Sequence, residues 1–369
     1  VEVATRAVTL VATATGRTTR AVVLGQLDEL ARDAGLLQRL PGTGRQVRRK
    51  VDQRVVHADV DLAEVVATQA TLVGERADDL AASHIAFQRR YDWDFIKVTP
   101  NSGYCVEDWV VETAYVGNLE GTREYRRYRI QAPEEWEALP VLDPRRGALG
   151  RQLETLHAIG AAVGGEVPYI QTIFNPLSVA KYLAGDDLMR VHLRRHPEQL
   201  KAGLEIITET TVAFVQEVMR AGAAGVFLAV QHAQYGLLSE EEYATFGRPY
   251  DLRVLEASSS GWFQLLHLHG ADVMFDLLAD YPVQVVNWHD RETPPTLAEG
   301  MLRVQGAVCG GLRQWETMVR GEPDAVRGEA ADAMAQTGGR RFILGTGCVT
   351  PIVAPTSHLM AVRRAVVHA

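Results

Sequence analysis

The sequence predicts an α/β fold, a (β/α)₈ TIM barrel, on three observations. Apolar runs of strand length recur along the chain, helix-like segments separate most of them, and polar residues follow the runs directly. Near-continuous apolar runs are typical of strands buried on both faces. Their alternation with helices predicts a parallel sheet wrapped by helices. The runs are 94–98, 169–174, 225–230, 263–269, 283–288, 307–312 and 342–344.

The helix-like segments carry recognisable boundaries. Residues 199–221 have apolar side chains at helical spacing and are followed by Gly222, and Ser239 with Glu242 forms a capping-box pattern. This alternation also permits a doubly wound open sheet. In a barrel the carboxyl ends of all strands face one mouth, so polar residues from six strand ends would share a pocket. An open sheet would separate its first and last strands.

Length and composition indicate one domain with an anomalous beginning. The chain has 369 residues, 47% of them hydrophobic, which is ample for a large core. We assign 79–369 to the barrel domain. The segment 1–78 contains no aromatic residue, since the first is Phe87, and we expect it to pack poorly. The eighth strand, which would close the barrel, is nevertheless expected within the first 75 residues.

Charge and cysteine usage exclude several classes of protein. A formal net charge of −8 disfavours a sequence-independent nucleic-acid binder, because neutralising phosphates needs a basic face. No apolar run approaches the ~18 residues that a membrane span requires. The 3 cysteines are far apart in the chain, which argues against a disulfide framework and for a reducing compartment. We therefore expect a cytoplasmic protein without nucleic-acid or membrane partners.

Two histidines and a cysteine form a candidate zinc site. His267 and His269 are two apart on a predicted strand, so their side chains point the same way. Cys348 follows a glycine-rich turn that presents its thiol over the same opening. Two imidazoles and one thiolate are a plausible catalytic zinc set with a fourth position left for water or substrate. The alternative is that these are core histidines and a buried apolar thiol.

Other polar residues at the strand ends are candidates for catalysis and substrate binding. His289 is a candidate fourth ligand or general acid, with Asp290 placed to orient its ring. Both are therefore predicted catalytic residues. The residues predicted to bind a polar substrate are Asn101, Asn175, Tyr182, Gln231 and His232.

Several segments, in the right order, resemble the uroporphyrinogen decarboxylase superfamily from about Asp79 to the C-terminus. They are Arg90-Tyr-Asp-Trp-Asp-Phe-Ile-Lys97, Asn175-Pro-Leu-Ser-Val-Ala-Lys-Tyr-Leu-Ala-Gly185, Leu237-Leu-Ser-Glu-Glu-Glu-Tyr243 and Leu344-Gly-Thr-Gly-Cys348 with Pro351 and Pro355. The resemblance implies a uroporphyrinogen decarboxylase-like barrel with its pocket at the mouth.

The porphyrin decarboxylases of that superfamily use an aspartate after an early strand, an arginine-rich segment near the N-terminus and a histidine after the last strand. Here the aspartate region reads Val98-Thr-Pro-Asn101, and Thr346 stands at the histidine position. No early segment resembles the arginine loop. Tyr182 and His232 do match pocket positions of the decarboxylases. The three departures count against decarboxylation of porphyrinogens.

The site motifs are most similar to the methylcobamide:coenzyme M methyltransferase branch. That branch binds zinc through His-x-Cys-Gly after a middle strand and Gly-x-Gly-Cys, followed by prolines, after the last. The matching residues are His267-Leu-His269-Gly270 and Gly345-Thr-Gly-Cys348, with His269 in place of the usual cysteine. Replacing one thiolate with a neutral imidazole would make the metal a stronger Lewis acid.

The resemblance implies a zinc-dependent methyltransferase that acts with a corrinoid or with a small thiol or oxygen substrate. The expected cofactors are zinc and a corrinoid, the latter as substrate or carried by a partner protein. The expected partners are a small-molecule substrate, a corrinoid protein and a second copy of the chain in a homodimer. The alternatives are a metal-free carboxy-lyase of porphyrin biosynthesis, zinc hydrolase or lyase chemistry on a small molecule, and a non-catalytic barrel.

Overall fold

Seven parallel strands form one sheet in the computed structural model, which describes residues 76–367. All seven apolar runs of the sequence are confirmed as strands, three of them with the predicted bounds. The strands are β1 (Ile96–Val98), β4 (Tyr169–Phe174), β5 (Gly225–Val230), β6 (Leu265–Leu268), β7 (Val285–Trp288), β8 (Ala307–Leu312) and β9 (Phe342–Thr346).

The strands are hydrogen-bonded in chain order, β1-β4-β5-β6-β7-β8-β9. A doubly wound sheet would reverse its order at a switch point, so this alternative is wrong. The observed sheet is the curled, barrel-like arrangement, with β1 and β9 as its edges within the described residues. The expected eighth strand lies outside the described residues. So do residues 1–75 of the anomalous segment 1–78.

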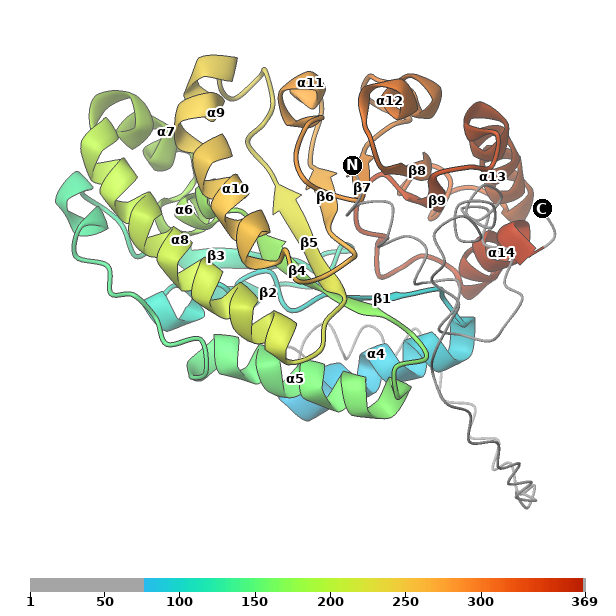
Figure 1. Cartoon of the computed structure of the whole chain (residues 1–369), viewed down its shortest axis with the longest axis horizontal. Helices are drawn as coiled ribbons and strands as arrows, with labels where there is room; N and C mark the ends of the chain where they lie inside the picture. Colours follow the sequence, from blue (N-terminus) through green and yellow to red (C-terminus); the bar gives the residue numbers. More distant parts are fainter. Residues whose placement is uncertain (1–75, 368–369) are drawn as a thin grey trace, which may run out of the picture.

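Helices follow the sheet around its outside, as Figure 1 shows. The predicted helix 199–221 is observed as α8, and the Ser239 capping box begins α9: Ser239 Oγ accepts from Glu242 N at 3.1 Å. The helices are α4 (Ala77–Tyr91), α5 (Gly147–Val163), α6 (Pro176–Ala184), α7 (Asp186–Arg195), α8 (Pro197–Arg220), α9 (Glu240–Phe246), α10 (Arg248–Ala257), α11 (Phe275–Leu278), α12 (Leu297–Arg303), α13 (Pro323–Thr337) and α14 (Thr356–Val367).

The last helix returns to the first described helix. The Tyr91 hydroxyl of α4 lies 3.5 Å from Thr356 Oγ1 of α14, and the Arg363 guanidinium lies 3.4 Å from the Asp92 carboxylate. Residues from the two ends of the described chain therefore meet in the helical layer. No helix of the described region is long and apolar enough to cross a bilayer.

Strand parity divides the core into two parts. In β6, Leu266 and Leu268 belong to the large cluster between sheet and helices. Leu265 belongs to a smaller cluster inside the curl of the sheet, together with Val285 and Cys309. His267 therefore faces the inside of the sheet, as its spacing from Leu265 requires.

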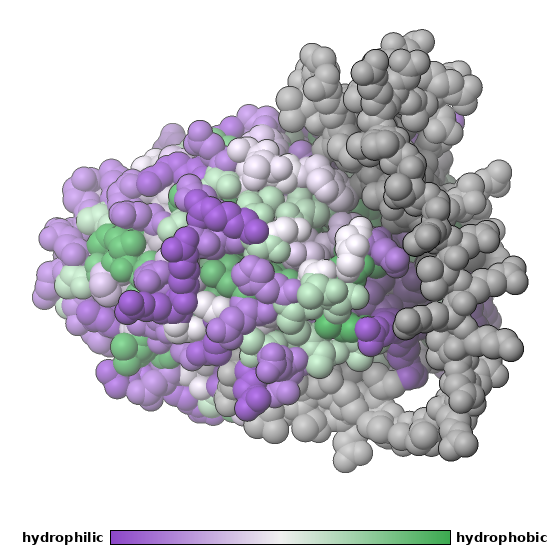
Figure 2. Space-filling view, turned by 60° about the horizontal axis from the view of Figure 1, so that its bottom comes forward, coloured by the Kyte–Doolittle hydropathy of each residue, from purple (hydrophilic) through white to green (hydrophobic). Residues whose placement is uncertain are grey.

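On the face shown in Figure 2, hydrophilic residues dominate and apolar residues form small separate groups.

A β-hairpin between β1 and α5 was not predicted. Its strands β2 (Glu112–Tyr115) and β3 (Arg123–Arg127) are half-exposed or exposed and mostly polar, so they lack the apolar run that identifies a buried strand. The loop between them contacts the segments that follow β8 and β9. Leu119 O accepts from Ile352 N at 3.1 Å, and Glu120 accepts from Trp315 Nε1 at 3.2 Å. The hairpin thus borders the mouth of the sheet.

Two helical glycines provide a test of the packing of α8 against the short 3₁₀ helix Pro133–Trp136. A Cβ on Gly203 would lie 2.6 Å from Trp136 Cε3, and Trp136 is fully buried, whereas a Cβ on Gly328 of α13 would meet nothing within 4 Å. We expect Gly203→Ala to destabilise the protein by about 1–2 kcal/mol, because overpacking outweighs the gain in helix propensity. Gly328→Ala, the matched control, should be neutral or stabilising by up to ~1 kcal/mol. Urea unfolding of both variants measures the difference, and equal effects would contradict this packing.

Candidate metal centre

The predicted zinc ligands come together at the carboxyl ends of β6, β7 and β9. One ligand atom from each of His267, His269, His289 and Cys348 lies within 4.8 Å of the others. Cys348 Sγ is 3.6 Å from His267 Nε2 and 3.4 Å from His269 Nδ1. His289, the predicted fourth ligand, completes the group, which we call the His/Cys cluster.

Cys348 reaches the cluster because the turn after β9 passes very close to the end of β7. A Cβ on Gly347 would lie 2.7 Å from His289 Cα and 3.0 Å from Trp288 O, so only glycine permits this approach. The Thr346 hydroxyl donates to Cys348 O within the turn. The glycine-rich turn therefore positions the thiol as the sequence predicted.

Asn287 fixes the orientation and tautomer of His267. These two residues are register partners on β7 and β6, and His267 Nδ1 lies 2.7 Å from Asn287 Oδ1. Asn287 Nδ2 donates to Cys309 O at 2.8 Å and to Thr346 O at 3.1 Å. Since both amide hydrogens are used, Asn287 Oδ1 accepts the Nδ1 proton. The lone pair of His267 Nε2 is then directed at the cluster.

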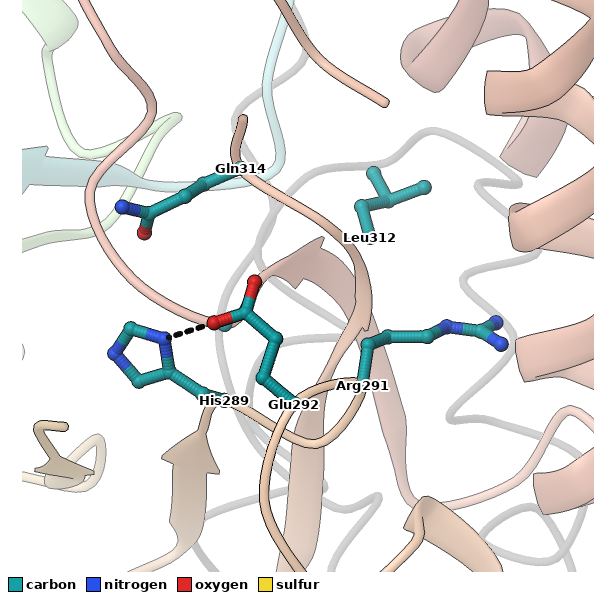
Figure 3. Close-up of a pocket in the computed structure, with 6 residues that line it drawn as sticks. His289, Arg291, Glu292, Leu312 and Gln314 are labelled. Carbon is teal, nitrogen blue, oxygen red and sulfur yellow. Dashed lines mark hydrogen bonds and ion pairs between the residues drawn. The ribbon is translucent and has the colours of Figure 1, made fainter. Parts of the chain in front are cut away.

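His289 is held by Glu292 and not by Asp290, so the prediction for Asp290 is wrong in this respect. His289 Nδ1 lies 3.3 Å from Glu292 Oε2, and Figure 3 shows the two side chains facing each other above β7. Asp290 instead accepts from Gly311 N at 3.0 Å and joins the β7 loop to β8. Burial raises the pKa of Asp290 to about 6. His289 Nε2 is buried and has no hydrogen-bond partner among the described residues.

Burial favours the uncharged forms of His267, His269 and Cys348. It lowers the pKa of His269 to about 4, with the neighbouring His289 contributing, and it lowers the pKa of His267 well below its ordinary value. It raises the pKa of the Cys348 thiol to about 11. Two neutral imidazoles offer lone pairs at neutral pH, whereas the thiol must lose its proton to bind a metal.

The donor set fits a zinc ion. Nitrogen and sulfur donors converge, and within residues 76–367 the buried His289 Nε2 lacks the partner that such an atom normally has. Imidazole and thiolate favour zinc over magnesium or calcium. An outer hydrogen bond such as that of Asn287 to His267 is typical of zinc-binding histidines. His267, His269 and Cys348 are the residues that would hold the ion, with His289 beside the remaining position.

A polar wall lies near the cluster on α6 and the β5 loop. Gln231 Oε1 accepts from the Tyr182 hydroxyl at 3.0 Å and from Lys181 Nζ at 2.5 Å. His232 is buried, with Nε2 2.9 Å from Asp186 Oδ1, and its Nδ1 has no partner in the described region. The structure thus brings three of the five predicted substrate-binding residues together.

The two predicted asparagines are engaged in local structure. Asn175 is fully buried: its Oδ1 accepts from Ser178 N as the N-cap of α6, and its Nδ2 donates to Asp251 at 2.8 Å and to Tyr243 OH at 3.3 Å. Its amide oxygen and nitrogen are all engaged, so the structure gives Asn175 a structural role in place of the predicted substrate contact. Asn101 Oδ1 accepts from Gly103 N at 2.9 Å and shapes the loop after β1.

Sequence reasoning missed three residues near the cluster, namely Asn287, Glu292 and Lys97. Asn287 lies on a strand whose parity with His267 could have suggested it. Glu292 follows His289 by three residues. Both lie in a loop, where this spacing does not predict that two side chains meet. Lys97 stands between two apolar residues of β1, and that isolated charge in a buried run was a signal.

Comparison with known proteins identifies the family. The family model described as uroporphyrinogen decarboxylase (URO-D) matches residues 118–368, more than half of the chain. The chain belongs to the uroporphyrinogen decarboxylase family. The predicted resemblance is thereby confirmed. The curated relatives of this chain include both decarboxylases and methyltransferases.

Curated relatives fall into these two groups. A uroporphyrinogen decarboxylase of Syntrophotalea carbinolica is 29% identical over 236 residues, which cover 61% of this chain and 67% of that protein. A methylated-thiol–coenzyme M methyltransferase of Methanosarcina mazei is 26% identical over 54% of this chain and 53% of its own length. The methylcobamide:CoM methyltransferase MtbA of Methanosarcina acetivorans is 24% identical over 38% and 41%. The matches to the two methyltransferases thus span about half or less of those proteins.

Solved structures support the fold of this family member. A methyltransferase from Methanosarcina mazei superimposes with a TM-score of 0.73 at 18% identity, over 83% of this chain and 89% of that one. A B12-independent methionine synthase from Shewanella sp. W3-18-1 gives a TM-score of 0.56 at 12% identity, over 80% and 88%. At these identities the likeness concerns the barrel-like fold alone.

Asn287 provides a test of how the cluster is organised. We expect Asn287→Leu to lower zinc affinity by roughly 10–100-fold, because His267 loses the hydrogen bond that fixes its tautomer. Asn101→Leu, which alters a loop residue outside the cluster, should leave zinc affinity unchanged. Competition with a chromogenic chelator measures both affinities. An Asn287→Leu protein that folds and binds zinc like the parent would contradict the role assigned to Asn287.

Proposed function

We propose that this family member is a zinc-dependent methyltransferase that transfers a methyl group from a corrinoid to a small thiol or oxygen substrate. The observation that carries the proposal is the convergence of three imidazoles and one thiol, with ligand atoms within 4.8 Å of one another, at the strand ends. No carboxylate or lysine hydrogen bond occupies His267 Nε2 or His289 Nε2 among the described residues, so these atoms are available to a ligand.

Each residue of the site has a task in such a reaction. His267, His269 and Cys348 would hold the ion, and Asn287 would orient His267 through its 2.7 Å hydrogen bond. When bound, zinc would lower the pKa of a coordinated thiol or hydroxyl group and so supply a nucleophile at neutral pH. His289, paired with Glu292, stands beside the remaining position, where it can accept the proton that the substrate releases.

The relatives lend this proposal support. Three of the curated relatives are methyltransferases whose names specify coenzyme M, and two of these names also specify methylcobamide. We infer a corrinoid donor for this chain from the same resemblance. A cytoplasmic location and a homodimeric state remain predictions from the sequence.

The second candidate function is carboxy-lyase activity of the porphyrin-decarboxylase type. The match to the uroporphyrinogen decarboxylase of Syntrophotalea carbinolica favours it. Against it stand Asn101 and Thr346, found where the decarboxylases carry an aspartate and a histidine. Neither side chain titrates near neutral pH, and the structure engages both in local turns. We therefore rank this function second.

Replacing a single cysteine separates the metal site from a core thiol. We expect Cys348→Ser to lose most of the bound zinc, since a neutral hydroxyl cannot replace a thiolate. The loss of zinc affinity should exceed the ~10–100-fold loss that removing an outer hydrogen bond causes. Its melting temperature should change little, because Cys348 sits on a loop at the mouth and the fold depends on the strands and helices.

Cys309 provides the matched control. It is buried inside the sheet and outside the cluster, so Cys309→Ser should bury a hydroxyl group at a cost of about 1–3 kcal/mol and retain zinc. Elemental analysis measures the zinc content of both variants, and thermal unfolding measures their stability. Unchanged zinc with a lowered melting temperature for Cys348→Ser would eliminate the metal site.

The reaction itself can be tested with free cofactor. Zinc-loaded protein should accelerate methyl transfer from methylcobalamin to 2-mercaptoethanol, in which a sulfur–carbon bond forms, the cobalt–carbon bond breaks and the thiol proton is released. Methylated thiol measured by gas chromatography should fall at least tenfold in Cys348→Ser. Carbon dioxide release from uroporphyrinogen by zinc-free protein, without methyl transfer, would favour the second candidate instead.

A further inference from the structure

A small hollow lies beside the His/Cys cluster, between the ends of β7 and β8 and the turn after β9 (Figure 3). Its volume is about 160 Å³. Pockets that take a whole small molecule usually measure ~300–1,000 Å³, so this hollow has room for one functional group of a ligand that extends from the mouth. The residues that line it are His289, Arg291, Glu292, Leu312, Gln314 and Gly347.

Hydrogen bonds hold the walls of the hollow together. Asp290 accepts from Gly311 N at 3.0 Å, and Arg291 Nε donates to Gly311 O at 2.8 Å, so the loop after β7 is joined to β8. Gly347 N donates to Leu312 O at 3.3 Å, which joins the turn after β9 to the end of β8. The hollow is therefore fixed to the strand ends that carry His289 and Cys348.

Gln314 lies in this wall on a stretch of chain that is anchored on both sides. Arg313 N donates to Glu329 Oε2 at 3.0 Å, and Trp315 Nε1 donates to Glu120 Oε1 at 3.2 Å. Gln314 is 8% exposed, and its Oε1 is buried without a hydrogen-bond partner within residues 76–367. Its neighbours thus fix its position, while its own amide oxygen is unpaired.

The amide of Gln314 differs from those of other buried glutamines. Three of these donate through Nε2 to backbone carbonyl oxygens at 2.6–3.0 Å and so serve local structure, namely Gln88, Gln171 and Gln264. No hydrogen bond of this kind holds the amide of Gln314 in the described region. Figure 3 shows this amide on the same side of the hollow as the imidazole ring of His289. The amide is therefore free to contact a ligand there.

The wall offers a second unpaired acceptor. His289 Nδ1 lies 3.3 Å from a carboxylate oxygen of Glu292, which only accepts, so Nδ1 carries the proton and Nε2 a lone pair. Nε2 is buried and has no partner among the described residues. The Arg291 guanidinium extends to the opposite side in Figure 3, where its Nη1 pairs with Asp332 Oδ2 at 2.6 Å. A group that enters the hollow therefore has to donate hydrogen bonds.

A buried amide oxygen without a hydrogen bond is unfavourable, and such atoms are rare in native structures. We propose that Gln314 is a specificity-determining residue whose amide oxygen accepts a hydrogen bond from a hydroxyl or amino group of the substrate. The substrate then carries two functional groups: the atom that reacts at the His/Cys cluster, and a hydrogen-bond donor a few bonds away that occupies the hollow. This inference rests on the proposed function in one respect, namely that the mouth holding the cluster is the substrate site.

Two thiols of nearly equal shape test this role. In 1-propanethiol a methyl group replaces the hydroxyl group of 2-mercaptoethanol, and ligand-observed saturation-transfer NMR on the zinc-loaded full chain measures the affinity of each. We expect Gln314→Met to lower the affinity for 2-mercaptoethanol about tenfold, because the hydroxyl group loses its acceptor, and to leave the affinity for 1-propanethiol unchanged. The comparison between variants is decisive, since 2-mercaptoethanol is also the more acidic thiol and binds a metal more readily for that reason.

Two further variants and a third thiol serve as controls. Gln314→Asn keeps the amide but draws it back by one methylene group, so it should retain part of the hydroxyl preference. Gln216→Met alters an exposed glutamine of α8, outside the hollow, and should bind the thiols like the wild type. Cysteamine distinguishes an amino donor from a hydroxyl donor, and a loss of affinity for either thiol in Gln314→Met supports the subsite.

Zinc content and melting temperature of the same preparations show what Gln314→Met changes. The variant should keep its zinc, and it should melt no lower than the wild type, because methionine replaces an unpaired buried amide. Unchanged affinities for both 2-mercaptoethanol and cysteamine in Gln314→Met would overturn the proposal. So would an equal loss of affinity for all three thiols, which marks a general disturbance of the mouth, or a loss of zinc, which assigns Gln314 to the metal site.

Titrations of metal-free protein keep the subsite apart from the proposed function. If the wild type binds no zinc but its affinity for 2-mercaptoethanol or cysteamine depends on Gln314, the subsite stands and the methyltransferase assignment fails. If zinc is bound through Cys348 and methyl transfer from methylcobalamin occurs, but no thiol affinity depends on Gln314, the proposed function stands and the subsite is rejected.

Discussion

Parallel pairing of the strands is the constraint on which the candidate site depends. Because β6, β7 and β9 run in the same direction, their carboxyl ends meet at one edge, and residues from distant parts of the sequence become neighbours. The register of β6 with β7 places His267 opposite Asn287, and this pairing makes their hydrogen bond possible. A shift of one residue would turn His267 toward the helices and Leu268 toward the mouth, with loss of the cluster.

Much of this arrangement could be predicted from the sequence because buried parallel strands leave a strong signal. Apolar runs bounded by polar residues located all seven described strands, and for β4, β5 and β8 the bounds agree to the residue. The spacing of His267 and His269 sufficed to place them on one side of the chain. Cys348 needed a further step, the expectation that a glycine-rich turn brings the last strand end over the same mouth. The first two inferences rest on local geometry alone, whereas the third also uses the fold class.

The remaining features depend on contacts through space, which local patterns do not encode. The β2–β3 hairpin carries exposed polar side chains, so neither strand shows the alternation of a half-buried strand. Glu292, three residues after His289, takes the role that adjacency suggested for Asp290, because Asp290 bonds to the backbone of β8. Asn175 follows a strand as a substrate residue would, but Pro176 begins a helix there and the amide caps it. A polar residue after a strand can therefore serve either the site or the next helix.

The charge of the site argues for the kind of ligand it accepts. The His/Cys cluster contains a single group that can become an anion, the Cys348 thiol, and burial lowers the pKa of His267 and of His269 and so keeps these two imidazoles neutral. One thiolate balances only half the charge of a divalent ion. With Lys97 and Lys181 nearby, the metal-bound mouth would be positive, and the carboxylates close to it are already engaged: Glu292 by His289 and Asp186 by His232. A low-dielectric pocket with excess positive charge stabilises anions strongly. The same field favours the deprotonated form of a thiol or hydroxyl group over its neutral form, so the charge of the mouth would help to prepare the nucleophile of the proposed reaction.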